Sequence, residues 1–149
     1  MLLIGLKNFG TQTVLADGIV NVGSTYRKFC KKNRCGMPAF ATTSNGVTLN
    51  HEGIYHITAT FVGTASAAGD VTIQLALNGI PVDGALTTQT VTTADTEVRT
   101  FVIDYYVKVD SNCVLGVTSV DTQTVTFVNV SDAIDVTLTD VVINVDKVV

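Results

Sequence analysis

The sequence predicts an all-β protein, folded as an antiparallel sandwich, from three observations. Apolar and polar side chains alternate with a period of two along residues 54–62 and 71–77, as expected when the two faces of a strand meet different surroundings. Valine and threonine, whose branched side chains suit a pleated surface, together make up roughly a third of the chain. No window carries the i, i+3, i+4, i+7 apolar stripe of an amphipathic helix, so we expect almost no helix.

The long strands are expected to turn one face toward a common core. Between the first two of them, Asn78-Gly79 supplies the positive φ of a two-residue turn. Pro81 cannot donate to a ladder, so the chain must turn or follow a sheet edge there. The core side chains that the alternation assigns are Tyr55, Ile57, Phe61, Ile73, Leu75, Phe101, Ile103 and Tyr105.

Along the chain, short strands come first and long strands follow. We predict strands near residues 2–6, 11–15, 19–22, 39–43, 47–49, 54–62, 71–77, 98–109, 114–120, 124–130 and 136–145. About ten strands within 149 residues suit a single two-sheet domain with a substantial core. The prediction is therefore one domain over 1–149, with residues 1–10 forming a loosely attached N-terminal arm.

The low charge content predicts self-association. Only 15% of the residues are charged, against about a quarter in an ordinary soluble domain, and the mean hydropathy is +0.39. No run of about 18 apolar residues occurs, so we expect no membrane helix and no membrane partner. We then expect weakly polar strand faces to be covered by identical subunits, and we predict an obligate homo-oligomer.

The amino terminus does not read as a signal peptide, because no basic segment precedes its six apolar residues. We therefore expect folding in a reducing cytosol, where Cys30, Cys35 and Cys113 stay as thiols. The glycosylation triplet at Asn129-Val130-Ser131 is then a chance match.

Four features resemble the C1q and tumour-necrosis-factor jelly roll in their order along the chain. They are a Gly53-Ile54-Tyr55 strand start, a strand ending in Leu77-Asn78-Gly79, a long strand running into residues 107–117, and a terminal strand near 136–145. The resemblance covers residues 46–145 and is closest to the leaderless versions found among bacteriophage structural proteins and bacterial surface proteins. It implies a ten-stranded jelly roll that trimerises around a three-fold axis. The Phe-Gly-bearing ending of vertebrate C1q domains is absent, which argues against an immune or cytokine function.

The alternation in the long strand supports a trimer independently. Its face opposite the core offers Val102 and Tyr106 among Thr100, Asp104 and Lys108. We assign Val102 and Tyr106 to the trimer interface. A solvated outer face is the alternative, because single exposed apolar residues need no explanation.

Five of the nine basic residues lie in one eight-residue segment, as Arg27, Lys28, Lys31, Lys32 and Arg34. We interpret this segment as a docking patch for an acidic capsid surface, an anionic glycan or nucleic acid, with a solvated loop as the alternative. Nucleic acid is the least favoured partner, because the sequence pI is near 4.8 and only Phe29 within the segment could stack on a base.

The sequence predicts no metal site and no cofactor. Cys30 and Cys35 lack the second ligand pair of a zinc site. His51 and His56 differ by an odd number, so they point to opposite faces if one strand spans both. Three carboxylates follow near the end of the chain, at Asp132, Asp135 and Asp140. Their spacing matches no calcium loop of the EF-hand type, and we expect them to lie in solvated loops.

Catalytic motifs are absent as well, since the chain holds no Gly-X-Ser-X-Gly and nothing favours a pairing of Cys113 with a histidine. We therefore expect a non-enzymatic structural protein of a bacteriophage virion, made in the host cytoplasm. It would be a homotrimeric capsid-associated decoration or accessory protein, or a head- or tail-fibre knob, that contacts capsid or fibre proteins and a host-surface glycan. A bacterial surface or spore-coat adhesion module is the first alternative, and a carbohydrate-active enzyme on a jelly-roll scaffold is the second.

Overall fold

The computed structural model describes residues 2–29 and 38–149. In these residues the chain is all β, with thirteen strands and no helix, which confirms the predicted fold class. The strands, in chain order, are β1 (Leu3–Asn8), β2 (Gln12–Val14), β3 (Ser24–Phe29), β4 (Phe40–Thr43), β5 (Gly46–Leu49), β6 (Gly53–Ala65), β7 (Gly69–Leu77), β8 (Ile80–Val91), β9 (Arg99–Val109), β10 (Ser111–Val114), β11 (Val117–Val120), β12 (Gln123–Asn129) and β13 (Val136–Lys147).

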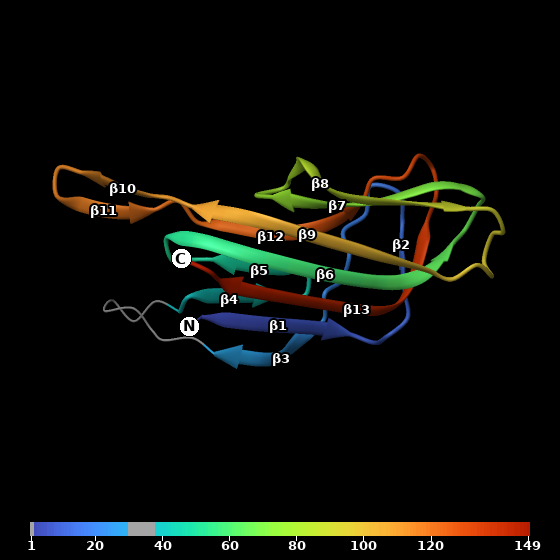
Figure 1. The fold of residues 1–149 in the computed structure, drawn as a ribbon, viewed down its shortest axis with the longest axis horizontal. Coiled ribbons are helices and arrows are strands. Elements are labelled where there is room, and N and C mark those ends of the chain that lie inside the picture. The colour runs from blue at the N-terminus through green and yellow to red at the C-terminus, as the bar shows by residue number, and fades with distance from the viewer. Residues whose placement is uncertain (1, 30–37) are drawn as a thin grey trace.

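The strands form two main antiparallel sheets and one projecting hairpin. Sheet A has the order β3-β1-β13-β6-β9, with β2 also paired to β13, and sheet B has the order β4-β5-β12-β7-β8. Strands that are far apart in sequence are neighbours in both sheets, as a jelly roll requires. The hairpin β10–β11 extends beyond the sandwich at the end where both termini lie (Figure 1).

A continuous apolar core fills the space between the sheets. Phe61 of sheet A meets Phe127 of sheet B edge to face, with ring centroids 5.2 Å apart. Tyr55 is fully buried, and its hydroxyl donates a hydrogen bond to the carbonyl oxygen of His51 at 2.8 Å. Burial raises the pKa of Tyr55 to about 12. Of the eight predicted core residues, seven are buried, and Tyr105 is half-buried against the same cluster.

The expectation of a loosely attached arm over residues 1–10 is wrong for the described part of that segment. Strand β1 pairs with β13 on one side and with β3 on the other, and Ile4 and Leu6 are fully buried. An apolar strand with two neighbours gains both ladder hydrogen bonds and burial. The amino-terminal segment is therefore an integral strand of sheet A.

Other boundaries also differ from the prediction. Residues 19–22 form only an isolated bridge, between Ile19 and Val128. The single strand expected over 114–120 is divided by a turn at Leu115 and Gly116 into β10 and β11. Strands β3 and β8 were not predicted; β8 tolerates Pro81 because β8 is an edge strand of sheet B. The predicted two-residue turn is confirmed, with φ of 51° at Asn78 and 81° at Gly79.

A buried polar cluster closes the end of the sandwich opposite the hairpin. The side chain of Asn129 is 1% exposed and donates to the carbonyl oxygens of Val14 at 3.2 Å and Ile134 at 2.8 Å. Its amide oxygen accepts a hydrogen bond from the Ser131 hydroxyl at 2.6 Å. The glycosylation triplet therefore lies in the core, where its amide nitrogen is already bonded.

We predict that Phe61→Ala lowers the free energy of unfolding by about 3 to 5 kcal/mol, because it removes a buried ring and leaves a cavity against Phe127. Urea denaturation followed by circular dichroism measures this loss. Val117→Ala, at an exposed apolar residue of the projecting hairpin, is the control and should change the free energy of unfolding little. A variant that unfolds like the wild type would contradict the register of β6.

Candidate functional site

The outer face of β9 carries the two residues assigned to a subunit interface. Val102 is 54% exposed and Tyr106 is 58% exposed, so the described residues of one chain leave them uncovered. The ring of Tyr106 stacks on His56 of β6, with centroids 4.7 Å apart. His56 Nε2 also lies 2.7 Å from Asp104 Oδ1. The result is an ordered surface of apolar, aromatic and polar groups, the composition found in protein interfaces.

The docking patch is described only in part. Arg27 and Lys28 lie on β3, where all six residues are exposed, so both cations are available to a partner. Lys31, Lys32 and Arg34, together with Cys30 and Cys35, lie outside the described residues. Strand β3 is at the edge of sheet A, and its pairing with β1 shifts register between Gly5 and Leu6. Cations and a bulge on an edge strand also hinder unwanted strand pairing.

A tyrosine that sequence reasoning did not single out lies beside these cations. The Tyr26 ring lies over Gly5 of β1, and its hydroxyl donates to Asn144 Oδ1 on β13 at 2.7 Å. Lys7 Nζ is 5.7 Å and Arg27 Cζ is 5.8 Å from the ring centroid. The adjacency of Tyr26 to Arg27 in sequence could have suggested part of this cluster; the contributions of β1 and β13 could not be read from it.

The hairpin end of the molecule holds an exposed apolar tip and a surface pocket. Leu115 is 99% exposed and has a φ of 52°, a conformation that is uncommon for a bulky residue. The pocket, of about 360 Å³, is lined by residues that include Glu52, Lys108 and Asp110. Both carboxylates have partners, because Ser111 Oγ donates to Glu52 and Lys108 Nζ is 2.7 Å from Asp110.

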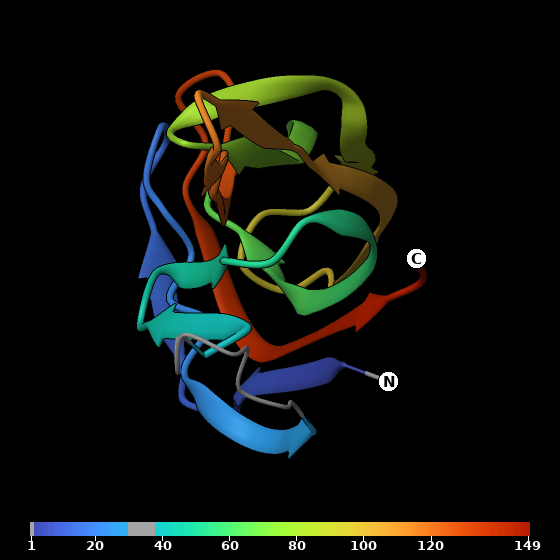
Figure 2. The same ribbon diagram turned by 90° about the vertical axis from the view of Figure 1, so that its left-hand side faces the viewer.

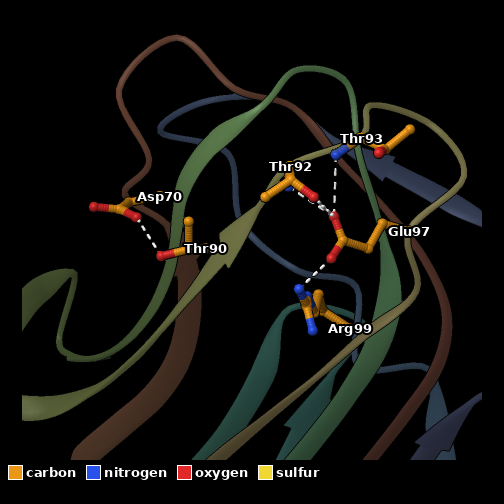
Figure 3. A network of polar contacts seen from close by, with 6 residues as sticks. All are labelled: Asp70, Thr90, Thr92, Thr93, Glu97 and Arg99. Atoms are coloured by element: carbon orange, nitrogen blue, oxygen red, sulfur yellow. Dashed lines mark hydrogen bonds and ion pairs between the residues drawn. The ribbon is translucent and has the colours of Figure 1, made fainter.

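At the opposite end, one carboxylate organises the loop between β8 and β9 (Figure 3). Glu97 Oε2 accepts hydrogen bonds from the backbone N–H groups of Thr92 at 2.7 Å and Thr93 at 3.0 Å. Its other oxygen pairs with the Arg99 guanidinium. The Thr93 and Thr92 N–H groups, together with Arg99, hold the pKa of Glu97 below its ordinary value of 4.5.

Other chemical groups are scattered over the described chain. Over 2–29 and 38–149, no group of three or more His, Cys, Asp or Glu residues could hold a metal ion, and no helix has the length and hydropathy to cross a membrane. Cys113 is an exposed thiol on β10. Only His56 of the two histidines lies on β6; His51 precedes that strand, so the two do not share one strand.

Solved structures that resemble this one have the same architecture over nearly their whole length. The globular domain of zebrafish complement 1qA protein matches with a TM-score of 0.63 at 8% identity, covering 100% of this chain and 98% of that one. The Eiger TNF of S. frugiperda matches with a TM-score of 0.67 at 12% identity, covering 100% and 94%. This chain has the C1q/TNF-like jelly-roll fold.

A viral protein is also similar to this C1q/TNF-like jelly roll. The PRD1 vertex protein P5 matches with a TM-score of 0.50 at 16% identity, covering 99% of this chain and 97% of that one. Neither a family model nor a curated protein matches the sequence. At these identities the likeness establishes the fold, and function must come from the surface.

We predict that Glu97→Gln lowers the melting temperature at pH 7 and that the difference from the wild type narrows at pH 3. The folded-state pKa of Glu97 is lowered, so its stabilisation is present above pH 4.5 and is lost as the pH falls through that lower value. Thermal melts at the two pH values measure the effect. Asp83→Asn, at an exposed carboxylate on β8, is the matched control. If Glu97→Gln lowers the melting temperature equally at both pH values, the stabilising role assigned to the ionised Glu97 carboxylate is refuted.

Proposed function

We propose that this protein is a homotrimeric structural component of a bacteriophage virion, either a capsid-associated decoration or accessory protein or the knob of a fibre. The observation that carries the proposal is the exposed Val102–Tyr106 face on a C1q/TNF-like jelly roll of low charge content. Covering that face with identical subunits removes apolar area from water, at about 25 cal/mol per Å² before the cost of association is deducted. The likeness to a vertex protein of PRD1 supports a virion role.

The proposed mechanism is adhesive. Three copies would bury the outer face of β9 and present three copies of the basic docking patch, which multiplies the attraction for an anionic partner. A partner surface on the particle, or a host-surface glycan, would then be held by several weak contacts at once, so that the overall affinity exceeds that of one contact. Arg27 and Lys28, both exposed on β3, support this role.

We infer a non-catalytic role from the pocket at the hairpin end. Glycoside hydrolysis needs two carboxyl groups that flank the substrate and remain free to exchange a proton. In this pocket, Glu52 accepts from Ser111 and Asp110 pairs with Lys108. Both carboxylates are therefore held by neighbouring side chains of the protein itself, which suits a structural role.

We predict that the purified protein has a mass about three times its 15.7 kDa and resists dilution. Tyr106→Glu should shift it toward the monomer, because a charge would be buried at the interface. Multi-angle light scattering after gel filtration measures both masses. Thr88→Glu, on the exposed face of sheet B, is the control and should stay trimeric. A wild type that is monomeric at micromolar concentration would refute the trimer.

We predict that reversing Lys31, Lys32 and Arg34 to Glu weakens attachment to the particle and leaves melting nearly unchanged, as expected of charges whose role is contact with an external partner. Wild-type attachment should also decline with added salt, since surface charges are screened within about 8 Å at physiological ionic strength. Co-sedimentation with particles that lack the endogenous protein measures attachment. If the triple variant attaches as well as the wild type, the docking role is refuted and the solvated-loop alternative stands.

A further inference from the structure

The Tyr26 side chain is held in one position on the outer face of sheet A. It starts on β3 and crosses β1 above Gly5, and its hydroxyl reaches Asn144 on β13 at 2.7 Å. A Cβ atom at Gly5 would lie 2.7 Å from Cε1 of the ring, closer than real carbon contacts, so glycine leaves the room that the ring occupies. The side chain is nevertheless 40% exposed, so part of a fixed ring is offered to solvent.

Two cations lie over this ring. Lys7 Nζ lies 5.7 Å and Arg27 Cζ lies 5.8 Å from the centroid, and both side chains belong to exposed residues. The register shift in the β1–β3 pairing puts Arg27 opposite Gly5 and Thr25 opposite Leu6, which leaves Tyr26 as the extra residue. A bulge redirects side chains in this way, and here it accompanies a tyrosine with two positive charges over its ring, on a chain whose net charge is −4.

We propose that Tyr26, Lys7 and Arg27 form a binding site for an acidic sugar unit of a glycan. The C–H groups of a pyranose ring can pack on the exposed part of the tyrosine ring, and a carboxylate or sulfate on that sugar can pair with the two cations. Because the hydroxyl bond to Asn144 already orients the tyrosine, binding loses little side-chain entropy. The inference rests on the proposed adhesive role and names the ligand class for part of the docking patch.

The geometry favours a sugar over the other anionic partners. A single-stranded nucleic acid needs successive stacking rings along a basic groove. In this cluster only the Tyr26 ring is fixed by a hydrogen bond; the exposed Phe9 ring, over which Lys7 also lies at 5.4 Å, has no polar atom to anchor it. A simple anion would be held by Lys7 and Arg27 without an oriented ring. An acidic sugar uses both the ring and the cations, so it accounts for the whole arrangement.

The test is isothermal titration of the full chain with a galacturonate tetrasaccharide and with a heparin tetrasaccharide, which separate carboxylated from sulfated sugars. Maltotetraose is the neutral control, and it should bind at least about tenfold more weakly than the better acidic sugar, because it lacks the anionic group. Gly5→Ala should weaken binding by about tenfold or more, since the added methyl displaces the ring and leaves both charges in place. Tyr26→Ala and Arg27→Glu should do the same. Lys147→Glu, a charge reversal at the end of β13, is the matched control and should bind like the wild type.

Each alternative has a distinct outcome. No binding of either acidic sugar, or an equal loss with Lys147→Glu, would overturn the site. Tighter binding of a thymidine oligonucleotide than of the sugars would assign the surface to nucleic acid instead. Loss of the trimer in Gly5→Ala or Tyr26→Ala, measured by light scattering, would place Tyr26 in a subunit interface. A monomeric wild type that binds the sugar would refute the trimer alone, whereas a trimer that attaches to particles and ignores both sugars would refute this site alone.

Discussion

The pairing of β13 with both β1 and β6 is the constraint on which the rest of the structure depends. It joins the beginning, the middle and the end of the chain in one sheet, through Leu3–Asn8, Gly53–Ala65 and Val136–Lys147. Since the side-chain period of a strand is two, the register of these pairs decides which residues face the core and which face outward. A slip of one residue would exchange the two faces of sheet A.

The same register aligns the outward side chains into rows across the sheet. One row runs from Gly5 through Asn144 and Thr58 to Asp104, and the next includes Asp146, His56 and Tyr106. The first row therefore provides the site of the Tyr26 ring near the β3 edge and one partner of His56 near the β9 edge. Viewed from the hairpin end, β1 and β3 lie together at one margin of the molecule (Figure 2). The two candidate surfaces thus occupy opposite margins of one rigid sheet, so a trimer contact at β9 and a ligand contact at β3 can coexist.

Low charge content favours the strand faces, and not a cleft, as the functional surface. Only 15% of the residues are charged, and the carboxylates at the hairpin-end pocket are engaged by Ser111 and Lys108. The sandwich instead offers broad, ordered faces with few polar groups, and such faces suit association with other macromolecules. The C1q/TNF-like jelly roll is a scaffold for such contacts, and its specificity is set by the residues placed on it.

The sequence by itself determined the fold class and most of the core. Alternation depends on local period, so Tyr55, Ile57 and Phe61 could be assigned to the core without knowing their neighbours, and Asn78-Gly79 could be assigned to a turn because its backbone conformation is local. Tyr105 is only half-buried. How far the opposite sheet covers a strand face varies along the strand, and local alternation does not reveal it. The place of β1 beside β13, the turn at Leu115 and the Tyr26 ring over Gly5 were decided by tertiary structure alone. Each requires contacts between residues distant in sequence, or a positive φ that a leucine in the sequence does not predict.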